Sequence, residues 1–138
     1  VAELADFFKI ETAVKKDKNT FRCFSISYPA FNGVYDLFYK DGKKIVSKKI
    51  LDSLNDTAWM VWFADAGGLT KQKAYLRTQK FGESGSHIVA DYFNSLGCER
   101  AVTTASRRLE VVFTPTGTKS YLGTFAHRMP NFVAARYA

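Results

Sequence analysis

The chain has 138 residues, the length of one ordinary domain, which is enough to bury most of its apolar surface on folding. Hydrophobic residues make up 46% and aromatic residues 15%, a composition that excludes a disordered chain and fits a folded α+β protein. The apolar stretches fall far short of the ~20 residues needed to span a bilayer, so no membrane partner is expected. The net charge of +7 instead indicates a polyanionic partner such as a nucleic acid.

The N-terminal part of the chain alternates between helix and strand patterns. No signal or transit peptide is visible ahead of them. The lysine-rich run 40–49 is interpreted as a solvated linker in preference to a specific contact. The predicted elements before it are a helix over 2–8, strands over 10–16 and 20–28 joined by a polar turn, and a helix over 33–40.

Residues 53–85 form a segment with no counterpart in the N-terminal part. The pattern predicts a helix with Asp56 as its N-cap, a stop at Gly67-Gly68, and then a hairpin from Leu69 to Phe81. Trp59, Trp62 and Phe63 recur at helical spacing and are assigned to the core. The elements predicted after the hairpin are a helix over 86–96, strands over 99–104 and 108–114, and a helix over 117–127.

Residues 1–52 and 86–138 have the pattern of two copies of one unit. Ala5-Asp6-Phe7-Phe8 matches Ala90-Asp91-Tyr92-Phe93, and along the alignment the offset stays between 85 and 88 residues. Chance similarity of aromatic-rich segments is the alternative. We therefore predict that residues 1–52 are the C-terminal part of a first repeat, that 53–138 form a second repeat, and that together they make one compact unit.

The cysteines and histidines carry no sign of a metal or nucleophile site. Cys23 and Cys98 lack CxxC or Cys/His spacing and are interpreted as reduced, buried thiols. His87 and His127 are isolated in the sequence, which favours surface or helix-packing roles. No cofactor is therefore expected from these residues.

Three segments together carry a family resemblance. The run Trp62-Phe63-Ala64-Asp65-Ala66-Gly67-Gly68 is followed by Arg77-Thr78-Gln79-Lys80-Phe81 and, near the end, by Met129-Pro130. In this order they resemble the second motif helix, the following strand and the C-terminal segment of single-chain, intron-encoded LAGLIDADG homing endonucleases. The resemblance implies an α+β fold in which antiparallel, saddle-like sheets are backed by helices.

The resemblance also implies a damaged catalytic site. In this family the aspartate directly before the first glycine binds the Mg²⁺ that activates water, and that position is Ala66 here. Asp65 points about 100° away on a helix and is a weak candidate ligand. Ala64 stands where methionine is usual, and Ala134-Ala135 where a lysine is expected. We expect no catalytic residue and no metal, with Mg²⁺ required only if the chain is a working endonuclease.

A nucleic-acid contact face is predicted on the strand 71–80, because family hairpins form a saddle that lies in the major groove. Strand periodicity places Ala74, Leu76 and Thr78 on the opposite, inward face. An ordinary solvated strand face is the alternative. The outward residues are Lys71, Lys73, Tyr75, Arg77 and Gln79, and the basic turn residues predicted at the rim are Lys15, Lys16, Lys18, Arg107 and Arg108.

The preferred hypothesis is a non-catalytic nucleic-acid-binding protein derived from a homing endonuclease. What the resemblance implies favours structured RNA over DNA and an organellar location, as a mitochondrial ribosome component beside ribosomal proteins or as an intron maturase. The sequence itself does not separate RNA from DNA, because one basic saddle serves both. The alternatives are a site-specific DNA homing endonuclease and a structural interaction module.

Overall fold

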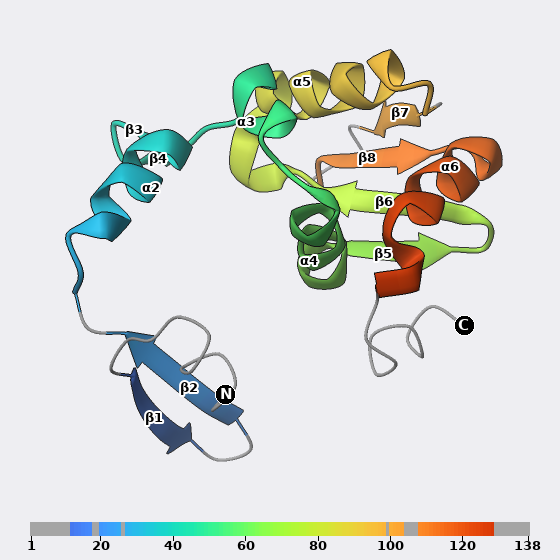
Figure 1. Ribbon diagram of the computed structural model, residues 1–138. Coiled ribbons are helices and arrows are strands. Elements are labelled where there is room, and N and C mark those ends of the chain that lie inside the picture. Colours follow the sequence, from blue (N-terminus) through green and yellow to red (C-terminus); the bar gives the residue numbers. More distant parts are fainter. Residues whose placement is uncertain (1–11, 18–19, 26, 99, 104–107, 129–138) are drawn as a thin grey trace. The chain divides into compact units, whose positions relative to one another are not determined.

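The computed structural model describes residues 12–17, 20–25, 27–98, 100–103 and 108–128 (Figure 1). The chain divides into two compact units, 1–37 and 38–138, which are considered separately. None of the helices in the described part of the chain has the length and hydrophobicity of a membrane span. The division into two repeats at residue 52 stays a prediction from sequence similarity.

The first unit contains an antiparallel hairpin followed by a helix. Strand β1 (Thr12–Asp17) pairs with β2 (Thr20–Ser25), with Asp17 opposite Thr20 at the turn. Helix α2 (Ala30–Phe38) begins directly after Pro29, three residues earlier than predicted. Proline fixes φ near the helical value and is tolerated at a helix start, which accounts for the earlier beginning. The helix predicted over 2–8 lies outside the described residues.

The second unit opens with a small hairpin and a short helix where a linker was predicted. Strands β3 (Tyr39–Lys40) and β4 (Lys43–Lys44) are joined by two residues with positive φ. Helix α3 (Lys48–Asp52) starts at Ser47, whose hydroxyl accepts from the Ile50 amide at 3.3 Å. The prediction that this segment is a linker was therefore wrong, although its lysines are exposed to solvent as predicted.

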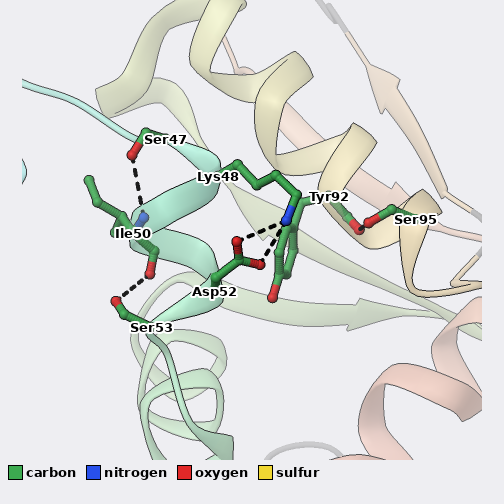
Figure 2. A network of polar contacts seen from close by, with 7 residues as sticks. All are labelled: Ser47, Lys48, Ile50, Asp52, Ser53, Tyr92 and Ser95. Atoms are coloured by element: carbon green, nitrogen blue, oxygen red, sulfur yellow. Dashed lines mark hydrogen bonds and ion pairs between the residues drawn. The ribbon is translucent and has the colours of Figure 1, made fainter.

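Figure 2 shows how α3 is held against the long helix α5 (Gly82–Ser95). Lys48 donates to both carboxylate oxygens of Asp52 at 3.0 and 2.8 Å, one turn away. The ammonium group of Lys48 also lies 5.8 Å from the centre of the Tyr92 ring on α5. The adjacent carboxylate raises the pKa of Lys48, and partial burial raises the pKa of the Tyr92 phenol. The contact between Lys48 and the Tyr92 ring thus links α3 to α5, two helices that are far apart in the sequence.

A four-stranded antiparallel sheet is the centre of the second unit. Tyr75 and Leu76 of β6 (Lys73–Arg77) lie opposite Val112 and Val111 of β8 (Glu110–Phe113). This register places alternate side chains of the two central strands on the same two faces. The strands, in their order across the sheet, are β5 (Gly67–Thr70), β6 (Lys73–Arg77), β8 (Glu110–Phe113) and β7 (Arg100–Thr103).

Three helices pack on one side of this sheet (Figure 1). Helix α4 (Asp56–Ala66) contacts β5 and β6, α5 contacts β7 and β8, and α6 (Pro115–Phe125) contacts β6 and β8. The short 3-10 turns η1 (Gln79–Phe81) and η2 (Ala126–Arg128) precede α5 and follow α6. The mixed helix and antiparallel-sheet class expected from the sequence is confirmed.

Two details of α4 correct the predicted boundaries. Its N-cap is Asn55, whose side-chain oxygen accepts from the Ala58 amide at 2.9 Å, and the predicted cap Asp56 is the first helical residue. The helix does end before Gly67, but that residue has φ −96° and needs no left-handed conformation. A side chain at Gly67 would collide with Phe63, so close packing explains the glycine.

Aromatic side chains fill the space between the helices and the sheet. Phe93 of α5 makes edge contacts with Phe113 and Tyr121, each at 5.0 Å between ring centres. The rings of Phe113 and Tyr121 stack at 4.6 Å, and Trp59 contacts Phe93 at 5.0 Å. The prediction that the aromatic residues of α4 are core is confirmed for Trp59 and Phe63, which are buried, and Trp62 is half-buried beside them.

Candidate nucleic-acid interface

Successive residues of strand β6 alternate between buried side chains and exposed or half-buried ones. Ala74 and Leu76 are fully buried beneath the helices, whereas Lys73 and Arg77 are exposed and Tyr75 is half-buried on the opposite side. The alternation predicted for this strand is confirmed over 73–77. We call the side of the sheet away from the helices the open side.

The strand is fixed in this orientation by contacts on its buried side. The Ala74 amide donates to the Thr118 hydroxyl of α6 at 2.8 Å. Just beyond β6, the buried Thr78 accepts from the Ser86 hydroxyl at 2.7 Å and donates to the Leu109 carbonyl at 3.2 Å. Because these groups are buried and paired, a slip of β6 by one residue would leave several of them without hydrogen bonds.

Three polar or aromatic side chains lie together on the open side. The Arg77 guanidinium lies 5.7 Å from the centre of the Tyr75 ring and its Nε is 3.9 Å from the Glu110 carboxylate on β8. The side chains of Arg77 and Glu110 are 48% and 21% exposed, so the arginine remains accessible for a further partner. The contacts on its two sides limit the freedom of Arg77 before any ligand binds.

Gly68 on β5 allows the Tyr75 ring to lie close to the sheet. The two residues are paired across the strands, and a Cβ atom at Gly68 would clash with the Tyr75 ring and hydroxyl. An aromatic ring over a strand glycine covers backbone that the missing side chain leaves bare. The open side therefore presents a ring held flat beside a charged arginine.

A hollow of about 700 Å³ opens on this side, at the β5–β6 turn. Its walls combine the Tyr75 ring and the Val112 side chain with charged and amide groups, so it offers both apolar and polar contacts. The lining residues are Thr70, Lys71, Gln72, Lys73, Tyr75, Glu110, Val112 and Pro115.

The remaining predicted contact residues are placed unevenly. Lys71 lies in the β5–β6 turn with φ 58°, not in the strand, and Gln79 lies in η1 beyond it; both are exposed. Arg108 is exposed just before β8. Lys15 and Lys16 belong to β1 in the other unit, and their side chains are not described. Lys18 and Arg107 lie outside the described residues.

Three residues of this surface were not predicted from the sequence, namely Glu110, Val112 and Gln72. Glu110 and Val112 occupy alternate positions of β8, and the register that brings them beside Arg77 and Tyr75 depends on pairing between strands more than 30 residues apart. The alternation of β8 itself was the available signal, because Val111 and Phe113 are both apolar and buried.

The C-terminal end of α4 was predicted to lack a metal ligand. Ala66 is the last helical residue and carries no side-chain oxygen, and Asp65 beside it is exposed. Among the residues that the structure describes, no group of three or more His, Cys, Asp or Glu side chains lies close enough together to hold a metal ion. Ala66 therefore supplies no ligand oxygen for Mg²⁺, and Asp65 is the carboxylate at this helix end.

Cys98 is a buried free thiol whose Sγ lies 3.6 Å from the Ser120 hydroxyl, as expected, while the Cys23 side chain is not described. His87 and His127 are exposed, in agreement with surface roles. Burial raises the pKa of the Tyr121 phenol far above its ordinary value, and the Cys98 thiol contributes a smaller effect in the same direction.

Comparison with known proteins identifies the family. A family model described as the LAGLIDADG DNA endonuclease family matches residues 4–114. The chain belongs to this family. Among solved structures, the homing endonuclease I-WcaI bound to its DNA recognition sequence matches with a TM-score of 0.77. That match covers 99% of this chain and 70% of I-WcaI at 14% identity, and no curated relative matches significantly.

Family membership and the structural match confirm the LAGLIDADG fold expected from the sequence. The predicted motif helix, from Asp56 to the stop at Gly67-Gly68, corresponds to α4 and the beginning of β5. The helix keeps the small and apolar residues of a LAGLIDADG motif but ends on an alanine. A nucleic acid is thus the expected class of partner, and the way in which this chain engages it is a matter of proposal.

Proposed function

We propose that this LAGLIDADG chain binds double-stranded DNA through the open side of its four-stranded sheet and that its second repeat supplies no metal-binding carboxylate from α4. The observation that carries the proposal is the alternation along β6, which presents Lys73, Tyr75 and Arg77 opposite a fully buried face. Basic side chains on a strand contact phosphates and base edges.

The charge balance of the open side supports a polyanionic ligand. Lys71 and Lys73 are exposed at one end of β6 and Arg77 at the other, with Glu110 as the acidic residue beside them. Pairing with Arg77 partly neutralises that carboxylate, so its repulsion of phosphates is reduced. The Tyr75 ring and Val112 add an apolar surface of the kind that contacts the methyl group of thymine.

The dimensions of the nucleic-acid grooves favour DNA over RNA as the partner of a strand surface. The B-form major groove is about 12 Å wide and admits a β-ribbon, while the A-form major groove is too deep and narrow for side chains to read. I-WcaI, which has a similar fold, was solved with its DNA recognition sequence. The preference for structured RNA in an organelle, as a ribosome component or maturase, remains a prediction, and RNA binding is an outcome of the test below.

The direct test is a titration of random-sequence DNA duplex at several salt concentrations, with duplex and structured RNA as competitors. Affinity for DNA is expected to fall steeply with salt, with a slope of about 0.9 per phosphate contacted. Binding to DNA that survives an excess of RNA supports the proposal. Preferential capture of structured RNA would replace DNA as the partner, and no binding at low salt would refute both.

Cleavage is tested separately, because the alanine at position 66 bears on metal binding and catalysis and not on the DNA affinity of the open side. Incubation of the chain with DNA and Mg²⁺ or Mn²⁺ is expected to leave the substrate intact, since α4 delivers no carboxylate oxygen at Ala66. The Ala66→Asp variant is the informative companion, because it restores the acidic side chain without altering the open side. A defined double-strand cut by the unmodified chain would contradict the proposal and support a working endonuclease.

A further inference from the structure

We propose that the β3–β4 hairpin, and not only the sheet, is a phosphate-binding element, with Lys40 and Lys43 as the paired contacts. The inference rests on the proposed function, because it assigns a second contact to the same nucleic acid. It concerns the lysine-rich run that the sequence pattern favours as a solvated linker.

The hairpin has a fixed geometry. Asp41 and Gly42 connect the strands with φ of 50° and 70°, and positive φ at both central residues is the signature of a type I′ turn. The hydrogen bond from the Ile45 amide to the Phe38 carbonyl, at 2.8 Å, extends the pairing beyond the two short strands. Side chains on such a turn have defined directions, which a flexible linker would not provide.

The hairpin is also anchored to the body of the second unit. The Lys44 ammonium lies 5.4 Å from the centre of the Phe81 ring in η1. Val46, two residues later, is buried and lies beside Gly85 of α5. Strand β4 contacts η1, which follows β6 in the chain after Thr78 alone.

Lys40 and Lys43 face each other across this hairpin. They are directly paired, so their side chains leave the same face of the ribbon, and both are exposed. Like charges directly opposite one another destabilise a strand pair. Throughout the described ranges no carboxylate forms an ion pair with either lysine, although Lys48 nearby is paired with Asp52. Phosphates bound at the two ammonium groups would reduce this repulsion.

The wider charge of the segment points to the same ligand class. Residues 38–49 contain five lysines and one aspartate, a local charge of +4. A nucleic-acid backbone carries closely spaced phosphates, which can engage two adjacent ammonium groups in succession. We therefore assign the hairpin to the phosphate backbone and not to base recognition.

The experiment compares three single variants that each remove one positive charge. Lys40→Gln and Lys43→Gln alter the hairpin, and Lys119→Gln is the control on α6, in the helical layer. Binding of random-sequence DNA duplex is measured across a salt series, beside the Lys73→Ala/Arg77→Ala double variant. Each hairpin variant is expected to flatten the salt slope by about 0.9, and the control to leave it unchanged.

Thermal unfolding checks that the hairpin variants are folded, and their midpoints are expected to be at or above that of the unmodified chain at low salt. If the hairpin variants match Lys119→Gln while the double variant is impaired, the inference is wrong and the proposed function stands. If the hairpin variants are impaired and the double variant is not, the hairpin assignment stands and the sheet face is wrong. If no variant changes binding, both are refuted.

Discussion

The two sides of the four-stranded sheet are built from the same strands yet have opposite properties. The helix-covered side carries Leu76, Val111 and Phe113, all with 0% exposure. The open side carries Arg77, Glu110 and Val112 from neighbouring positions of the same two strands. Successive strand residues point to opposite faces, so one sequence segment serves folding and presents a contact surface at once.

The geometry indicates that stability and binding are separable in this domain at the level of single residues. Substitutions on the covered side remove packed apolar contacts and affect the folded state. Substitutions on the open side remove charge or exposed surface, where effects on stability are usually small. The predictions below test whether the two sides are as independent as the geometry indicates.

Leu76→Ala is expected to have the largest effect, a loss of about 2–5 kcal/mol in the free energy of unfolding. Leu76 has 0% exposure and lies beneath the helices, so the truncation leaves a cavity in the main core. Chemical denaturation measures the loss. Val112→Ala on the open side is the matched control, and an equal loss in that variant would contradict the division between the two sides.

The Lys73→Ala/Arg77→Ala double variant is expected to weaken DNA binding by about 1–3 kcal/mol for a good contact while changing stability by less than about 0.5 kcal/mol. Both side chains are exposed on the open side, and Arg77 packs beside Tyr75. Binding titrations and denaturation of the same preparation give the two values. Normal binding in this variant would mean that the contact surface lies elsewhere.

Alkaline conditions probe the covered side through Tyr121. Burial holds the pKa of its phenol far above the usual value, so above about pH 10 the unfolded chain loses this proton and the folded chain keeps it. The free energy of unfolding therefore falls by about 1.4 kcal/mol per pH unit from this group as pH rises, and no such loss occurs below pH 10.

Tyr121→Phe removes this titration while retaining the ring that stacks on Phe113. The difference in stability between the variant and the unmodified chain is expected to shift in favour of the variant as pH rises above about 10. Denaturation at a series of alkaline pH values measures the difference. A constant difference across the series would show that the folded and unfolded chains release the proton alike.

Local periodicity predicted the elements of the second unit that carry a strong pattern. The alternation over 73–77 identified the buried Ala74 and Leu76, and helical spacing identified Trp59 and Phe63 as core. Boundaries were less predictable, because they depend on particular contacts. Asn55 is the cap in place of the expected Asp56, and Gly67 follows α4 because a side chain there would collide with Phe63, not because a left-handed backbone is needed.

The candidate site was only partly visible in the sequence. The outward residues of β6 follow from one strand's pattern, but their neighbours Glu110 and Val112 depend on pairing with a distant strand. The turn at Asp41-Gly42 is a strong hairpin signal between very short strands, and the abundance of lysine around it obscured that signal. The register between β6 and β8 and the pairing of Lys40 with Lys43 depend on the folded structure, so the sequence pattern did not predict them.

The smallest expected effect concerns the helix that covers the sheet at β5. Asn55→Ala is expected to cost about 1 kcal/mol in the free energy of unfolding, because the Asn55 oxygen accepts from the Ala58 amide at 2.9 Å and alanine leaves that donor to water. Asn55→Ser serves as the matched control, since serine is an equally good cap and should restore most of the loss.

DNA binding of both variants is expected to equal that of the unmodified chain, because Asn55 begins a helix of the covered side and the contact surface lies on the open side. Denaturation measures the first expectation and a salt titration the second. Weakened binding in Asn55→Ala at unchanged salt slope would show that the position of α4 influences the open side, and the two sides would then have to be treated as coupled.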